Sequence, residues 1–184
     1  MTKPALTLII VFLSFSFASA QSGKRATAEE KNLLFRLIKQ DLLDLLSESA
    51  HSPDEKEELV RSAAQTLEIR KVDLNRDGRP EYIVKVEGEG VDFCGALANC
   101  PRWVFRKTQR GFERIAFDEG ARELTPQKSS TKGYRDLPAL AGSTAIEDAV
   151  VIYKYNGRKY WATDCFAREF SGARMKVKRV KCEQ

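Results

Sequence analysis

Oxygen-bearing side chains alternate along one short segment of the chain. Asp73, Asn75 and Asp77 stand at every second position, Gly78 follows, and Glu81 comes four residues after Asp77. A hard cation such as Ca²⁺ prefers roughly six to eight oxygen ligands. A tight turn brings such oxygens together, and Gly78 permits the turn because glycine tolerates positive φ. The segment therefore predicts a calcium-binding turn.

The pattern D-x-N-x-D-G-x-x-E over residues 73–81 resembles the short calcium loops of FG-GAP (integrin-type) repeats and of dockerins. The resemblance implies a ligand set of four side chains and one main-chain carbonyl: the side chains of Asp73, Asn75, Asp77 and Glu81, and the carbonyl of Arg79. An EF-hand is excluded because its twelfth loop position requires glutamate and is Val84 here. Apolar residues alternate after Glu81, which predicts a turn between two strands. An Asx-rich turn without metal is the alternative.

The first twenty residues have the features of an export signal. Lys3 supplies a positive start, residues 6–17 are mostly apolar, and residues 18–20 are the small-residue cleavage sequence A-S-A. The apolar run is shorter than the roughly 20 residues that a membrane span needs. We expect residues 1–20 to be a signal peptide. The mature protein should then be secreted or periplasmic and should have no membrane span.

The cysteines are even in number, as expected for an exported protein with disulfides. All four, Cys94, Cys100, Cys165 and Cys182, follow the predicted signal peptide. Three pairings are possible. We favour Cys94 with Cys100 across a short loop and Cys165 with Cys182 across the last hairpin. The sequence contains no C-x-x-C spacing, so it indicates neither a zinc site nor a redox pair.

The chain carries a net charge of +5, and its densest basic run is residues 174–181, R-M-K-V-K-R-V-K. Strand alternation puts Met175, Val177 and Arg179 on one face and Lys176, Lys178 and Val180 on the other. Such a strand could meet an acidic surface, a glycan or a nucleic acid. The simpler interpretation is a solvated edge strand that lysine and arginine protect from aggregation. Nucleic acid is not an expected partner.

Two helices are predicted after the signal peptide. Thr27 and Glu30 form a capping-box pattern before leucines and an isoleucine at helical spacing, which predicts a helix over residues 28–48. Ser52, Pro53 and Glu55 give an N-cap, an N1 proline and an N3 glutamate, which predicts a second helix over residues 53–67. Together, residues 28–67 are predicted to form a helical hairpin.

Residues 68–184 have the features of short strands and turns. We expect strands at 69–74, 82–87, 103–108, 112–117, 149–155, 159–163 and 175–182, and a long loop over 125–143 with a brief strand entry at 133–137. The predicted fold is α+β: an N-terminal two-helix hairpin packed on an antiparallel β-sheet or meander, with disulfides. Residues 21–184 should form a single domain.

The order of several short motifs gives a second resemblance. A D-x-N-x-D-G-x-x-E-Y loop, C-G-x-x-x-x-C before W-V-F, then G-Y-R-D-L and Y-N-G-x-x-Y occur in this order between residues 73 and 161. The succession is similar to small exported bacterial proteins of poorly defined function. The resemblance implies an architecture and a compartment, and it implies no reaction.

Little in the sequence indicates an enzyme. His51 is the sole histidine, and no G-x-S-x-G or phosphate-binding glycine loop is present. A glycosidase needs only two carboxyl groups, for which Asp118 with Glu119, or Glu147 with Asp148, are candidates. Adjacent acids are more often solvated charges, so we predict a protein that is not an enzyme.

The remaining function classes are binding proteins. We predict an exported binding module with a structural calcium loop that recognises an envelope glycan or protein. The alternative is an inhibitor or immunity-type protein that blocks a hydrolase. A row of exposed aromatic side chains would favour glycan binding. A protruding loop at residues 99–102 would favour inhibition.

Overall fold

The computed structural model describes residues 25–86, 93–94 and 96–182, so the predicted signal peptide lies outside the described residues. Helix α1 (Ala28–Leu45) and helix α2 (Pro53–Gln65) each begin with the predicted capping box, at Thr27 and Ser52. Each box satisfies two of the backbone N–H groups that a helix start leaves unpaired. Neither helix has the length and apolar character needed to cross a membrane.

The first sheet contains four antiparallel strands in the order β1-β2-β3-β4. These strands are β1 (Leu67–Val72), β2 (Glu81–Val86), β3 (Cys100–Thr108) and β4 (Gly111–Ala121), and the short 3₁₀ turn η1 (Ala96–Ala98) precedes β3. The acidic segment joins β1 to β2, which pair antiparallel. It therefore connects two strands, as the alternation after Glu81 predicts.

The second sheet contains five strands in the order β11-β10-β9-β8-β5. Its strands are β5 (Glu123–Leu124), β8 (Leu137–Gly142), β9 (Glu147–Tyr155), β10 (Tyr160–Ser171) and β11 (Arg174–Val180). A small hairpin of β6 (Ser130–Thr131) and β7 (Tyr134–Arg135) forms a third sheet. The α+β class is confirmed, but the expectation of one sheet or meander is too simple.

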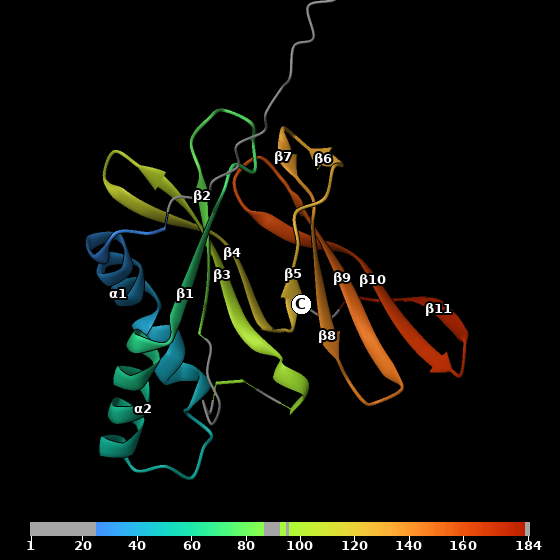
Figure 1. Cartoon of the computed structure of the whole chain (residues 1–184), viewed down its shortest axis with the longest axis horizontal. Helices are drawn as coiled ribbons and strands as arrows, with labels where there is room; N and C mark the ends of the chain where they lie inside the picture. Colours follow the sequence, from blue (N-terminus) through green and yellow to red (C-terminus); the bar gives the residue numbers. More distant parts are fainter. Residues whose placement is uncertain (1–24, 87–92, 95, 183–184) are drawn as a thin grey trace, which may run out of the picture.

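The first sheet lies between the helices and the second sheet (Figure 1). Tyr82, Val84 and Val86 of β2 pack in one core with residues of both helices, including Ile38. Ile83, which points to the opposite face because side chains alternate along a strand, packs in a second core with residues of the five-stranded sheet. Strand β2 is consequently buried on both faces.

Strand β8 lies inside the segment predicted to be a loop. The sequence L-P-A-L-A-G contains Pro138, and proline within a run argues against a central strand. Here the Pro138 carbonyl accepts from Thr125 N–H, just beyond the end of β5. The N and C=O of one residue point to the same side of a strand, so the proline nitrogen faces the β5 side and points away from β9. The missing N–H therefore costs no hydrogen bond between β8 and β9.

Strand β10 is much longer than the predicted strand 159–163. Its outer part, residues 164–171, pairs with β9 on one side and with β11 on the other. Charged and apolar residues occur on both faces of this part, since neither face is fully covered. The hydrophobic alternation that identifies half-buried strands is therefore absent here.

Two disulfides join the pairs expected from the sequence. Cys94 is bonded to Cys100 and Cys165 to Cys182, and the described part of the chain contains no free cysteine. The first bridge closes a loop before β3. The second ties β10 to the end of the segment that follows β11.

Candidate functional site

Hydrogen bonds from backbone N–H groups to side chains of the same segment hold the acidic turn together. Asp73 accepts from the N–H of Gly78 through Oδ2 at 3.0 Å. Asn75 accepts from Asp77 N–H at 3.1 Å, and Asp77 accepts from Arg79 N–H at 2.7 Å. Gly78 has φ of 83°, the left-handed conformation that glycine adopts without strain. The sequence-predicted positions are thus brought together in one tight turn.

Glu81 lies beneath this turn and is almost completely buried. Its Oε2 accepts from the N–H of Leu74 at 2.8 Å. Burial, together with the nearby charges of Asp77 and Asp73, raises the pKa of Glu81 to about 7 against the opposing effect of the hydrogen bond from Leu74 N–H. Three carboxyl groups consequently share a site in which the hydrogen bonds come from neutral donors.

One oxygen in the turn has no partner. Asp73 Oδ1 is buried and accepts no hydrogen bond from the described part of the chain. Carboxylate, amide and carbonyl oxygens are the donor set that calcium prefers, and Arg79 supplies a main-chain carbonyl at the expected position. Among the described residues, no three His, Cys, Asp or Glu side chains converge tightly enough to hold a metal ion. The donor chemistry of the turn fits calcium, whereas the side chains as arranged do not form a closed cage.

A cluster of tyrosines supports the turn from below. Asn75 Nδ2 donates to the hydroxyl of Tyr134 at 3.2 Å, and the Tyr134 ring stacks on Tyr155 with centroids 4.0 Å apart. The Arg106 guanidinium donates to the Tyr155 hydroxyl at 3.2 Å and to Glu113 at 2.7 Å. Tyr134 occurs in the G-Y-R-D-L motif, but no feature of the sequence identifies Arg106 as part of this network.

A groove of about 630 Å³ adjoins the acidic turn. Its walls come from the turn, from β2 and from the end of β3 with its following turn, and they include Asp77, Arg79, Arg106, Lys107 and Tyr134. Arg106 is ion-paired with Glu113, and Lys107 lies 3.4 Å from Glu30. Acids and bases are mixed in these walls, so the groove selects neither sign of charge.

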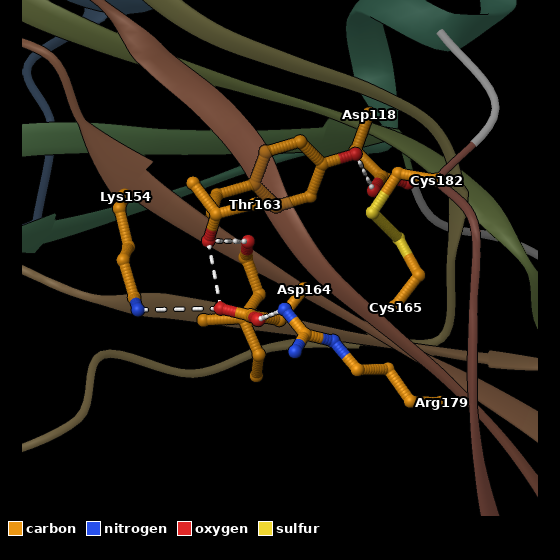
Figure 2. Close-up of a disulfide and its surroundings, with 9 residues drawn as sticks. Asp118, Lys154, Thr163, Asp164, Cys165, Arg179 and Cys182 are labelled. Atoms are coloured by element: carbon orange, nitrogen blue, oxygen red, sulfur yellow. Dashed lines mark hydrogen bonds and ion pairs between the residues drawn. A yellow bond between two sulfur atoms is a disulfide. The ribbon is translucent and has the colours of Figure 1, made fainter.

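The hairpin of β10 and β11 is the most exposed part of the second sheet. Every residue of β11 is exposed. Figure 2 shows Asp164 between Lys154 and Arg179, close to the Cys165–Cys182 disulfide. These contacts attach β11 to β9 and β10 at the end where the chain leaves the sheet.

Apolar side chains gather on this hairpin. Five of the nine exposed large hydrophobic residues in the described chain belong to β10 or β11: Trp161, Phe170, Met175, Val177 and Val180. The register places Phe170 opposite Met175 and Arg168 opposite Val177. Phe170, Met175 and Val177 therefore lie on one face, together with Phe166. We call this side of β9–β11, opposite the side that carries the second core, the open face.

One carboxylate of each pair considered for a glycosidase is bound by a neighbouring side chain. Asp118 accepts from the Tyr153 hydroxyl at 2.7 Å, and the buried Asp148 is bound by both Nε and Nη2 of Arg168. Glu147 is exposed, and the side chain of Glu119 lies outside the described part. The two described carboxylates next to one another in sequence, Glu147 and Asp148, point to opposite faces of β9.

Residues 99–102 do not protrude. Cys100 and Arg102 are buried, and the Asn99 side chain both donates to and accepts from the backbone of Gly142. Arg102 donates to the carbonyl of Ala121 at 2.8 Å. The loop that would have favoured an inhibitor instead lies where the two sheets meet and contacts both of them.

Known proteins add no further constraint: no protein-family model, no curated protein and no solved structure matches the chain.

Proposed function

We propose that the protein is an exported, non-enzymatic binding module that recognises another protein of the cell envelope through the open face of β9–β11. The observation that carries this proposal is the concentration of exposed apolar side chains on the β10–β11 hairpin. Phe170, Met175 and Val177 are neighbours on one face of this hairpin, and exposed apolar side chains that gather in one place mark interaction sites.

The rest of the molecule acts as a support in this proposal. The two helices pack on one face of the first sheet, and the first sheet in turn supports the second. Ion pairs at Asp164 and Asp148 and the Cys165–Cys182 bridge hold the exposed strands in place. A pre-ordered surface loses little conformational entropy when it binds, which favours affinity.

We also propose that the acidic turn binds one structural Ca²⁺, as the FG-GAP and dockerin resemblance implies. Asp73, Asn75, Asp77 and Glu81, with the carbonyl of Arg79, would hold the ion. The unpartnered Asp73 Oδ1 and the donor chemistry of the turn support this role. The bound ion would offset the repulsion among the carboxylates and stiffen the β1–β2 connection, and it supplies no reaction chemistry.

A glycan is the second candidate ligand. Trp161 and Phe170 are both exposed on β10, with Phe166 partly exposed between them, and aromatic side chains offer flat apolar surfaces. Lys159 lies over the Trp161 ring at 5.5 Å. Binding of purified envelope glycans to the wild-type protein, lost on Trp161→Ala, would favour this ligand over a protein.

Capture from an envelope extract tests the proposal. The immobilised wild-type protein is compared with a variant that carries Phe170→Ser and Val177→Ser, and bound partners are identified by mass spectrometry. The matched control carries Leu37→Ser and Leu45→Ser, which change two exposed apolar residues of α1. A partner held by the wild type and the control but lost by the open-face variant supports the proposal. A partner set identical in all three proteins overturns it.

A further inference from the structure

Strand β11 ends the five-stranded sheet and carries an unused backbone edge. In the described part of the chain, β10 is its one strand neighbour. The two-residue turn makes Ser171 and Arg174 a directly opposed pair, and in such hairpins that pair exchanges hydrogen bonds. By alternation, Met175, Val177 and Arg179 direct their N–H and C=O groups to the outer edge. An added strand would find its hydrogen-bond partners there.

The side chains of β11 separate charge from apolar surface. Met175 and Val177 lie on the open face and are more than half exposed, at 53% and 54%. Lys176 and Lys178 lie on the opposite face, and they form no ion pair or hydrogen bond within the described chain. Arg179 differs from them because it is paired with Asp164. The strand thus offers two unpaired ammonium groups on one side and two apolar groups on the other.

A hollow of about 630 Å³ lies beside these lysines. Ala149 and Ala167 are opposite one another on β9 and β10, and Ala167 is opposite Lys178 on β11. Because these two alanine side chains are small, the sheet surface beside Lys176 and Lys178 is hollowed. Glu147 and Glu169 also line this hollow, so its floor is mixed in charge while its outer rim is basic.

We propose that β11 is the docking edge for an extended protein segment in which acidic and apolar residues alternate, and that this segment adds to the sheet as a further strand. Its carboxylates would face Lys176 and Lys178, and its apolar side chains would cover Met175 and Val177. This inference rests on the proposed binding function and specifies the chemistry of the protein partner.

Charge decides which strand β11 accepts. Residues 174–181 contain five lysines or arginines and no acid. A second copy of β11 would bring lysine next to lysine, and like charges on neighbouring strands are unfavourable. Lysine on an edge strand therefore discourages self-association, as in other edge strands, while it still admits an acidic partner.

Fluorescence anisotropy with the full mature chain tests the inference. The probe is a short labelled peptide in which Glu and Val alternate. Comparison probes are a peptide of the same composition with the glutamates in one block, a copy of the alternating peptide N-methylated at every second residue, a sulfated glycan and a single-stranded DNA. We expect the alternating peptide to bind at least about tenfold more tightly than the block peptide or the N-methylated peptide. The N-methylated peptide loses N–H groups needed for strand pairing, and the block peptide does not place its acidic side chains on one face and its apolar side chains on the other.

Two protein variants separate charge from backbone pairing. Lys176→Glu with Lys178→Glu should weaken binding of the alternating peptide by about tenfold or more, since it replaces attraction by repulsion. The matched control, Arg110→Glu with Arg158→Glu, makes the same change in net charge on two other turns and should bind like the wild type. Val177→Pro removes an outward N–H and should also abolish binding. The N-methylated peptide gives the same information if that variant does not fold.

Each other outcome overturns the inference. Equal binding of the alternating, block and N-methylated peptides would mean non-specific attraction of acids, and tighter binding of the glycan or DNA would mean a polyanion site. Absence of peptide binding would also overturn it. If the open-face variant still loses its envelope partner in that case, the proposed function stands and strand addition alone fails.

Discussion

The first sheet and the outer part of the second sheet are built from similar strands but meet different surroundings. In β2 and β3, helices cover one face and the second sheet covers the other, so Val84, Trp103 and Val104 are fully buried. In β11, every residue is exposed. The comparison teaches that position in the layers, and not strand propensity, buries one region in the core and leaves the other exposed, where we propose that it serves recognition. Substitutions should affect the two regions in opposite ways.

The largest effect is expected in the helix-covered core. Ile38 is completely buried at the centre of α1. Ile38→Ala removes buried methyl groups and leaves a cavity, which should lower the free energy of unfolding by roughly 2–5 kcal/mol. Val177→Ala in β11 should change it by less than about 0.5 kcal/mol. Urea denaturation of both variants checks the contrast, and similar losses would show that the regions do not differ as described.

The second prediction concerns Glu30, which links α1 to the first sheet. Burial would raise its pKa, but hydrogen bonds from Lys71, Tyr82 and the backbone of Thr27 outweigh burial and lower the pKa from 4.5 to about 2. A carboxyl group whose pKa is lowered in the folded protein stabilises the fold at pH values above its pKa in the unfolded chain. It loses this contribution as the pH falls toward its pKa in the folded protein. We expect Glu30 to contribute up to roughly 3 kcal/mol to the free energy of unfolding. This contribution is complete above pH 4.5 and is lost as the pH falls to about 2.

The measurement is the free energy of unfolding between neutral and acid pH. Glu30→Gln should remove most of the stability loss in this window. Glu29→Gln, at the exposed neighbouring position, should retain the wild-type profile. An unchanged profile in Glu30→Gln would assign the acid sensitivity to other carboxylates.

The third prediction compares the two disulfides. Cys165–Cys182 closes a longer loop, with a separation of 17 residues against 6 for Cys94–Cys100. In the chain-entropy model the longer bridge contributes about 3 kcal/mol and the shorter one about 2 kcal/mol. Melting of the double serine variants, Cys165→Ser/Cys182→Ser and Cys94→Ser/Cys100→Ser, measures both. A larger loss of stability on removing Cys94–Cys100 would mean that the start of β3 depends more on its disulfide than the β10–β11 hairpin does.

The smallest predicted effect is that of calcium on the acidic turn. An ion that binds only the folded turn stabilises by RT ln(1 + [Ca²⁺]/Kd), which is roughly 1.4 kcal/mol for a Kd of about 10⁻⁴ M and calcium near 10⁻³ M. Magnesium should stabilise less, because it requires a tighter octahedral shell. Melting curves with chelator, calcium and magnesium measure these effects.

Asp73→Asn is the matching variant, since its amide oxygen can still accept from Gly78 N–H while the negative charge is lost. It should lose the calcium response and keep the turn. A calcium response equal to that of the wild type would exclude Asp73 as a ligand. No response in either protein would leave the turn as an Asx-rich connection without metal.

Local rules predicted the elements whose signals lie within a few residues. The capping boxes at Thr27 and Ser52 placed both helix starts, and the last turns ended two or three residues earlier than expected. The alternation around residues 73–84 placed the acidic turn between two strands. The same rules missed β8, because Pro138 normally excludes a central strand, and they missed residues 164–171 of β10, because an open face carries no hydrophobic period.

Sequence alone determined the helices, the acidic turn and the favoured cysteine pairs, since each depends on spacing along the chain. Tertiary structure alone decided that the strands form two layered sheets, that Arg106 and Tyr134 support the turn, and that residues 99–102 are buried. It also decided that Lys176 and Lys178 lie on an edge strand that has β10 as its one strand neighbour in the described part of the chain. The physical reason is that burial and pairing between distant segments depend on which faces meet. A period of two residues shows that a strand has two faces, but it does not show what covers them.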